Sequence, residues 1–215
     1  MEPRARIADV LVTVAAAAAF AWLAVQRRSG ATMGLDLAIR RRVHESASPA
    51  MTAIARVLAT VGSPVVLPLF FAIAIVSFHR LHWTREAIAL TGVMAAAIVC
   101  NLGLKRLIHC ARPEPFFGTD PSSYSFPSGH ALYSLCFYGV IAVALAAHAP
   151  PGLARIAIGA AAALLVAGIG LSRVYLGVHY PSDVVAGYVA AIFVIGAVFA
   201  FWPILLGCRS TGGAP

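Results

Sequence analysis

A polar segment near the C-terminus, SRVYLGVHYPSD at Ser172–Asp183, separates two long apolar runs. Within it His179 and Asp183 stand four residues apart, a spacing that puts two side chains on one face of a helix. Pro181 suits the first turn of that helix. A carboxylate one turn from an imidazole can accept a ring N–H, fix the tautomer and leave the other nitrogen free to attack. His179 is therefore a candidate nucleophile, oriented by Asp183.

Three cations stand at or near the ends of apolar runs. Lys105 is the only lysine among sixteen basic residues, Arg112 follows seven residues later, and Arg173 lies at the start of the polar segment. Ammonium and guanidinium groups bind phosphate oxygens and offset the charge that develops in phosphoryl transfer. We predict that all three bind phosphate.

A further segment, PSGH at 127–130, stands where another apolar run begins. Ser128 is a natural N-cap, and Gly129 permits a ligand to approach the backbone closely. The N-terminus of a helix binds anions through its free N–H groups. We predict that Ser128 and Gly129 bind phosphate, and that His130 is the general acid that protonates the departing oxygen and later activates water.

Acidic residues are scarce near these segments. Of eight in the chain, only Glu114, Asp120 and Asp183 fall in the polar connections. A magnesium site needs several oxygen ligands, and the cations already supply positive charge. We predict a reaction without a metal or another cofactor. The four cysteines lack metal-ligand spacing and are expected to be small apolar residues.

The chain as a whole has the composition of a membrane protein. Over its full length it is 60% hydrophobic and 11% charged, with a mean hydropathy of +0.87, which excludes an ordinary soluble domain. Apolar runs of about 20 residues without alternation indicate membrane helices. We predict an all-α integral membrane protein with six transmembrane helices, forming one domain over 1–215. The expected spans are Val10–Gln26, Val57–His79, Ala87–Leu104, Ala131–Ala154, Ile156–Ser172 and Val184–Cys208.

The connection between the first two spans carries an amphipathic pattern. Leu35, Ile39 and Val43 recur at helical spacing beside the arginines at 40–42. The pattern predicts one or two short helices at the membrane interface, with the arginines toward lipid head groups; a solvated linker is the alternative. The Gly-Ser-Pro sequence at 62–64 predicts a break or kink near the start of the second span.

The three polar segments together resemble the signature of the type 2 phosphatidic acid phosphatase family, the lipid phosphate phosphatases. KRLIHCARP at 105–113, PSGH at 127–130 and SRVYLGVHYPSD at 172–183 match it at every signature position. The resemblance implies the assignments made above for the phosphate ligands, the acid and the nucleophile pair. It also implies a core shared with soluble vanadium-dependent haloperoxidases. The hydrophobicity of this chain disfavours a haloperoxidase activity.

The resemblance further implies a multi-pass enzyme of the inner or plasma membrane. Bacterial members dephosphorylate phosphatidylglycerophosphate, phosphatidic acid or undecaprenyl pyrophosphate, usually at a site facing away from the cytoplasm. We therefore expect hydrolysis of a lipid phosphate or pyrophosphate through a phosphohistidine. Two alternatives stay open: a lipid phosphotransferase using the same residues, and a non-enzymatic lipid-binding or transport protein, whose polar residues would lie at helix centres.

The basic residues do not choose an orientation. The net charge of +8 would suggest nucleic acid in a soluble protein, but in short membrane loops it indicates topology and lipid contact. With a cytoplasmic N-terminus, that side carries six Lys or Arg residues and the other carries ten, three of them predicted phosphate ligands. When the three predicted ligands are left out, six basic residues on one side face seven on the other, which gives no preference between the two orientations. The extracytoplasmic site is therefore an expectation from the resemblance alone.

Overall fold

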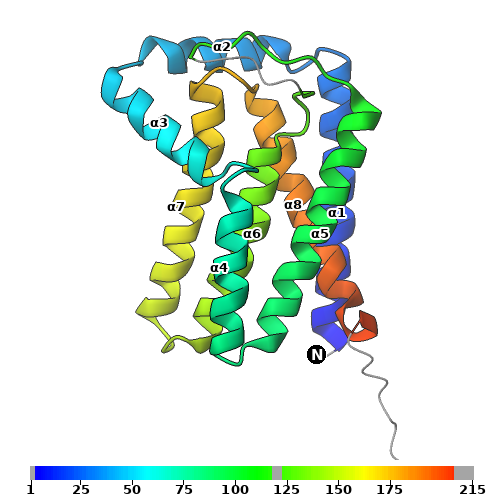
Figure 1. Cartoon of the computed structure of the whole chain (residues 1–215). Coiled ribbons are helices and arrows are strands. Elements are labelled where there is room, and N and C mark those ends of the chain that lie inside the picture. Colours follow the sequence, from blue (N-terminus) through cyan, green and yellow to red (C-terminus); the bar gives the residue numbers. More distant parts are fainter. Residues whose placement is uncertain (1–2, 118–122, 206–215) are drawn as a thin grey trace, which may run out of the picture.

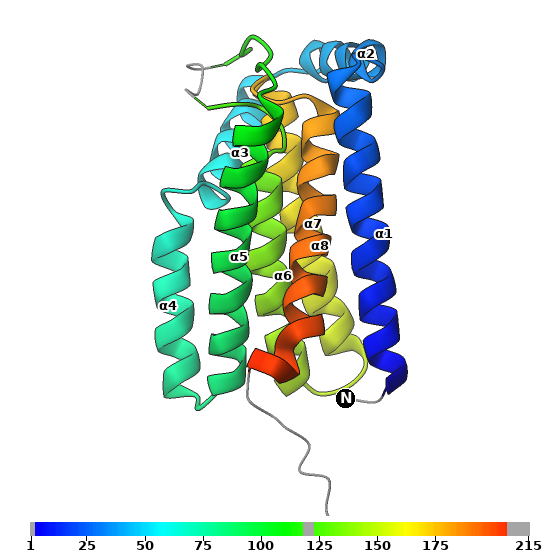
Figure 2. The same cartoon turned by 90° about the vertical axis from the view of Figure 1, so that its right-hand side faces the viewer.

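The computed structural model describes residues 3–117 and 123–205, and every regular element within them is an α-helix. The eight helices are α1 (Pro3–Arg28), α2 (Met33–Glu45), α3 (Pro49–Val61), α4 (Leu67–Arg80), α5 (Thr84–Ile108), α6 (Gly129–His148), α7 (Leu153–Tyr175) and α8 (Pro181–Leu205). Most of them run up and down as a bundle, and α2 lies across one end of it (Figures 1 and 2). The predicted all-α class is confirmed.

Five helices are long and apolar enough to cross a membrane: α1, α5, α6, α7 and α8. The expected second span is divided instead, because α3 ends at Val61 and α4 begins at Leu67. The break falls at the predicted Gly-Ser-Pro sequence, where Pro64 has no N–H to continue a helix. The 14 residues of α4 extend about 21 Å, against a hydrocarbon core of about 30 Å. Six spans are therefore not confirmed.

The other helices differ from the expected spans mainly at their ends. Lys105 and Arg173 lie inside the last turns of α5 and α7, because long cationic side chains can extend toward water from an apolar helix. By contrast, α6 ends at His148, six residues before the expected end, because two prolines follow it at 150 and 151. The expected end of the last span, Cys208, lies outside the described residues.

The packing of the bundle fits a lipid environment. A buried apolar cluster joins α4, α5, α6 and α8, with Leu90, Val93 and Leu132 completely covered. Large apolar side chains nevertheless stay exposed on the outer faces, as at Val99 and Leu164, which are 73% and 75% exposed. Such a surface is unfavourable in water but is at no disadvantage against lipid tails.

The predicted short helix is present as α2, but its arginines do not all face outward as predicted, since Arg41 and Arg42 are exposed and Arg40 is buried. Asp36 and Arg40 are only 2% and 7% exposed, whereas Leu35 and Ile39 are 68% and 37% exposed. The charged pair thus faces the protein, and these two apolar side chains face outward. The expectation that Arg40 faces lipid head groups is wrong, because its guanidinium is held by backbone carbonyls.

The topology gathers the polar segments at one end of the bundle. The last turns of α1, α5 and α7 and the first turns of α6 and α8 meet beneath α2 (Figure 1). The loops that carry the predicted phosphate ligands and the predicted nucleophile therefore lie together, as alternating topology required.

Candidate active site

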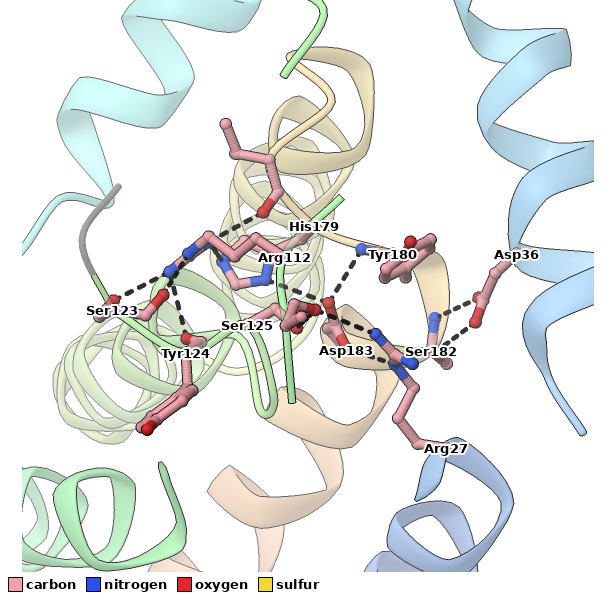
Figure 3. A network of polar contacts seen from close by, with 12 residues as sticks. Arg27, Asp36, Arg112, Ser123, Tyr124, Ser125, His179, Tyr180, Ser182 and Asp183 are labelled. Atoms are coloured by element: carbon pink, nitrogen blue, oxygen red, sulfur yellow. Dashed lines mark hydrogen bonds and ion pairs between the residues drawn. The ribbon is translucent and has the colours of Figure 1, made fainter. Parts of the chain in front are cut away.

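His179 and Asp183 contact each other at the start of α8, and both are almost fully buried. Asp183 Oδ2 lies 3.4 Å from His179 Nδ1 and accepts the Tyr180 N–H at 2.9 Å (Figure 3). The expected helical face is wrong, because Pro181 begins the helix and His179 lies in the loop before it. Asp183 instead reaches back from the first turn over the helix start, as the acidic residue of a capping box does.

Arg112 indicates which nitrogen of His179 carries the proton. Its Nη1 lies 2.9 Å from His179 Nε2, and a guanidinium can only donate hydrogen bonds. Nε2 is therefore the acceptor, and the ring proton lies on Nδ1, facing Asp183. Burial lowers the pKa of His179 to about 4; Asp183 opposes this shift, whereas the charges of Arg112 and Arg173 add to it. The ring is neutral, with a lone pair at Nε2.

Lys105 and Arg112 both hold the chain at Ser123 and Tyr124. Lys105 Nζ donates to the Tyr124 carbonyl and lies 3.4 Å from Ser123 Oγ. Arg112 donates to the Ser123 carbonyl at 2.6 Å through Nε and to the Val178 carbonyl at 2.8 Å through Nη1. Two of the three predicted phosphate-binding cations therefore meet next to the imidazole, with donors directed at oxygen atoms, the type of acceptor that phosphate offers.

The PSGH segment begins α6 as predicted, with Ser128 at the N-cap and Gly129 as the first helical residue. The Ser128 N–H donates to the Asp183 carbonyl at 2.9 Å, which joins the starts of α6 and α8. The Ser128 hydroxyl makes no capping hydrogen bond, so that part of the prediction is wrong. At Gly129 a side chain would lie 3.2 Å from Asn101 Nδ2, so glycine also lets α5 approach closely.

His130 and Arg173 complete the group. His130 lies in the first turn of α6, within electrostatic range of Arg173 and His179 and against the backbone of Ala59 in α3. Arg173 Nε and Ser128 Oγ are both buried and have no hydrogen-bond partner among the residues that the structure describes. Buried donors are nearly always satisfied, so two unsatisfied ones beside an imidazole indicate a place for a polar ligand.

Sequence reasoning missed Arg27, at the end of α1. Its Nε donates to Asp183 Oδ1 at 3.2 Å, and its Nη2 donates to the Ala111 carbonyl at 3.4 Å (Figure 3). The guanidinium also lies over the Tyr180 ring, 4.4 Å from the centroid. Nothing in the local sequence distinguishes Arg27 from its neighbour Arg28, because the pairing depends on how α1 packs against α8.

Two further residues that were missed come from α2. Asp36 accepts the Ser182 N–H at 2.9 Å and the Ser182 hydroxyl at 2.6 Å, so it caps α8 from another helix (Figure 3). Arg40 donates to the carbonyls of Glu114 and Gly177, at 2.7 and 3.0 Å, and so joins the two loops that carry the motifs. Their i,i+4 spacing was the available signal, since it puts both charges on one helical face.

The described residues contain no cluster of three or more His, Cys, Asp or Glu side chains that could hold a metal ion. The cationic side chains gathered around His179 would repel a metal rather than bind it. Metal-independence stays a prediction, which a chelator tests directly.

Comparisons with known proteins agree with this arrangement. A family model described as PAP2 superfamily matches residues 86–205. The chain is 34% identical over 146 residues to phosphatidylglycerophosphatase B of Bacillus subtilis, covering 65% of this chain and 69% of that protein. It is 35% identical over 158 residues to decaprenylphosphoryl-5-phosphoribose phosphatase of Mycobacterium tuberculosis, covering 70% and 79%.

A solved structure shares the whole architecture. The crystal structure of a transmembrane PAP2-type phosphatidylglycerolphosphate phosphatase from Bacillus subtilis superposes with a TM-score of 0.80. The match covers 93% of this chain and 98% of that one, at 25% identity. The fold and these matches define a multi-pass membrane phosphatase, a phosphoric ester hydrolase. The chain belongs to the PAP2 superfamily, and this membership disfavours the alternative of a lipid transporter.

Proposed function

We propose that this protein hydrolyses a phosphate or pyrophosphate group of a membrane lipid through a phosphohistidine at His179. The observation that carries the proposal is the orientation of the buried ring, with Nδ1 on Asp183 and Nε2 accepting from Arg112. A neutral imidazole held in this way is prepared to attack phosphorus through Nε2.

The reaction would proceed in two displacements. In the first, Nε2 of His179 forms a bond to phosphorus as the bond from phosphorus to the lipid oxygen breaks, and His130 donates a proton to that oxygen. In the second, His130 accepts a proton from water as the water oxygen attacks phosphorus and the bond to Nε2 breaks. Inorganic phosphate leaves, and both histidines return to their starting states.

The cations and the start of α6 would stabilise the transferred group. Lys105, Arg112 and Arg173 present positive charge around His179, and phosphoryl transfer depends largely on such positioning and charge stabilisation. As phosphorus approaches Nε2, it would take the place of the Arg112 contact, and the guanidinium would then bind a phosphate oxygen. The buried Ser128 hydroxyl and Arg173 Nε are donors that a phosphate would satisfy.

An apolar cavity supports a lipid substrate. It measures about 430 Å³ and lies between α4 and α5, lined by Leu67, Phe71, Met94 and Ile98 among others. Tyr133, one turn after His130 in α6, also lines it, so the cavity extends toward the catalytic end of the bundle. A hydrocarbon chain in this cavity would place its head group near the cations.

We place the site on the extracytoplasmic face of the inner or plasma membrane, with a cytoplasmic N-terminus. Two basic residues of the site face, Arg27 and Arg40, are buried and paired within the protein, so they do not report on topology. Six basic residues then remain on the N-terminal side against five on the site side, a bias that no longer opposes this orientation. The pair α3 and α4 would make the remaining crossing jointly.

The test is phosphate release by the purified protein in detergent with EDTA present. The panel contains phosphatidylglycerophosphate, phosphatidic acid, undecaprenyl pyrophosphate and a polyprenylphosphoryl phosphoribose. We expect His179→Ala to abolish release, whereas His79→Ala, an exposed histidine at the opposite end of the bundle, keeps the wild-type rate. Rapid quenching with radiolabelled substrate should trap acid-labile label on the wild type and on His79→Ala, but not on His179→Ala. Undiminished release by His179→Ala would overturn the mechanism.

The same panel separates hydrolysis from transfer. If the purified protein releases no phosphate from any of these lipids but still becomes labelled, the second displacement uses another lipid as acceptor. The protein would then be a phosphotransferase that uses the same residues.

A further inference from the structure

Arg27 at the end of α1 and Asp183 at the start of α8 form a buried ion pair, although they lie 156 residues apart in sequence. The two side chains are 7% and 0% exposed, and the Nε to Oδ1 distance is 3.2 Å. A pair this deeply buried is worth little to stability on balance, because desolvation offsets the attraction. Its presence next to the nucleophile therefore calls for an explanation in terms of function.

The carboxylate of Asp183 divides its two oxygens between different partners. Oδ2 accepts the Tyr180 N–H and faces His179 Nδ1, whereas Oδ1 accepts from Arg27 (Figure 3). With both oxygens engaged, the plane of the carboxylate is fixed, and Oδ2 stays aligned with the imidazole. Without Arg27, Oδ1 loses the donor that holds it, and the carboxylate can turn away from Nδ1.

Arg27 is also the cation in direct contact with the buried Asp183 carboxylate, whereas Arg40 and Lys105 act on it from a greater distance. His179 is neutral, so it offers Asp183 a hydrogen bond but no counter-charge. An ionised carboxylate left without a counter-charge inside a protein is strongly disfavoured. A protonated Asp183 no longer holds the proton of His179 on Nδ1, and a proton moved to Nε2 blocks the nucleophile.

We infer that Arg27 is a positioning residue for catalysis, which acts through Asp183 to hold His179 in its nucleophilic tautomer. The inference rests on the proposed function, in which His179 Nε2 attacks phosphorus. Arg27 also contacts the Ala111 carbonyl, in the motif that carries Arg112, and the Tyr180 ring. It therefore joins α1 to two of the three motif segments.

The experiment compares Arg27→Gln, which keeps an amide donor but removes the charge, with Arg27→Lys, which keeps the charge. Arg28→Gln is the matched control, since Arg28 is the next residue, has the same charge and is exposed. Loss of the residue that orients a catalytic histidine costs about 10⁴-fold in kcat, which sets the upper bound for Arg27→Gln. We expect Arg27→Gln to lose about 100- to 1,000-fold in kcat with KM nearly unchanged, and Arg27→Lys to recover most of it.

A double-variant cycle distinguishes positioning from a general structural effect. If Arg27 acts through Asp183, then Arg27→Gln should cost little in an Asp183→Asn background, because the residue it orients is already lost. Millimolar guanidinium should also partly restore the kcat of Arg27→Ala, but not that of Asp183→Asn. If Arg27→Gln fails to accumulate as folded protein, the Arg27→Lys and guanidinium measurements decide the question.

Two results would overturn the inference: a kcat for Arg27→Gln equal to that of Arg28→Gln, or losses that multiply fully in the double variant. A His179→Ala arm is run in parallel. If that arm stays active, the proposed mechanism itself fails; if it is inactive while Arg27→Gln keeps wild-type kcat, only the assignment of Arg27 fails.

Discussion

Gly187 lies where the starts of α6 and α8 touch, so a larger residue at this position should push the two helix starts apart. It lies in α8, one turn after Asp183, and touches the start of α6. A Cβ atom at this position would lie 2.6 Å from the Ser128 carbonyl oxygen and 2.9 Å from Ala131 Cβ. Neither neighbour is the flexible end of a side chain, so Gly187→Ala must displace one helix start from the other.

The size of the effect follows from these distances. The contact with Ser128 falls about 0.8 Å short of ordinary van der Waals separation. Overpacking of this kind costs about 1–3 kcal/mol of stability. His130 moves with α6, whereas Asp183 moves with α8, so the displacement separates the predicted acid from the nucleophile pair. A misplacement of about 1 Å can cost about 100-fold in rate, and we expect kcat to fall by about 30- to 100-fold.

The assay measures kcat and the thermal midpoint of unfolding for purified variants in detergent. Gly139→Ala is the control without a clash, since its nearest contact would be 3.5 Å away. Gly196→Ala is the control with a clash elsewhere, because its Cβ would meet Thr13 Oγ1 at 2.3 Å, between α8 and α1. We expect Gly196→Ala to lower the midpoint with little loss of kcat. A kcat for Gly187→Ala within threefold of that of Gly139→Ala would refute the reasoning.

Two further predictions concern the histidines. If the substrate is a pyrophosphate, His130→Ala should keep a far higher kcat/KM than His179→Ala, because kcat/KM reports the first displacement and a phosphate monoester leaves without protonation, whereas an alkoxide does not. With a monophosphate substrate both variants should be nearly inactive. Equal losses of kcat/KM on a pyrophosphate would contradict this assignment of the acid. The His130→Ala variant, assayed on a pyrophosphate, should also report the ionisation of His179 alone. Burial lowers the pKa of His179 to about 4, and only the neutral ring attacks. We therefore expect kcat/KM to stay level as the pH falls to about 5 and to decline tenfold per pH unit below about 4. A decline centred near about 6.5 would instead show that His179 titrates as an ordinary imidazole.

The helices could be predicted because their apolar runs are long and continuous. The errors in the predicted helices occur where hydropathy does not reveal the direction of a helix or which of its faces packs against the protein. The run from Val57 to His79 is apolar throughout, yet Pro64 divides it, and hydropathy alone does not reveal how far the two pieces diverge. In α2 the pattern identified the helix but placed Arg40 on the wrong face, because a charged side chain of an interfacial helix can turn toward the protein when it finds buried partners.

The motif residues could be predicted because each segment carries its own spacing, and counting spans brings the segments to one end. The contacts that these side chains make could not be predicted as well. His179 and Asp183 meet through the back-reaching first turn of α8 rather than along a helical face, and the Ser128 hydroxyl does not cap its helix. Both differences arise where a loop joins a helix, and there one residue of offset in the helix start changes which partners a side chain can reach.

The residues that escaped prediction share a location. Arg27, Asp36 and Arg40 all precede residue 86, where the match to the PAP2 family model begins. Each is buried, and each bonds to a motif segment: Arg27 to Asp183, Asp36 to Ser182, and Arg40 to the Gly177 carbonyl. No spacing rule links residues that lie more than a hundred positions apart: the i,i+4 spacing of Asp36 and Arg40 could have marked a shared helical face, but only the packing of α1 and α2 reveals their partners. These two helices therefore do more than anchor the chain in lipid: without α1 the Asp183 carboxylate would lose its ion-pair partner Arg27, and without α2 the start of α8 would lose the cap that Asp36 supplies.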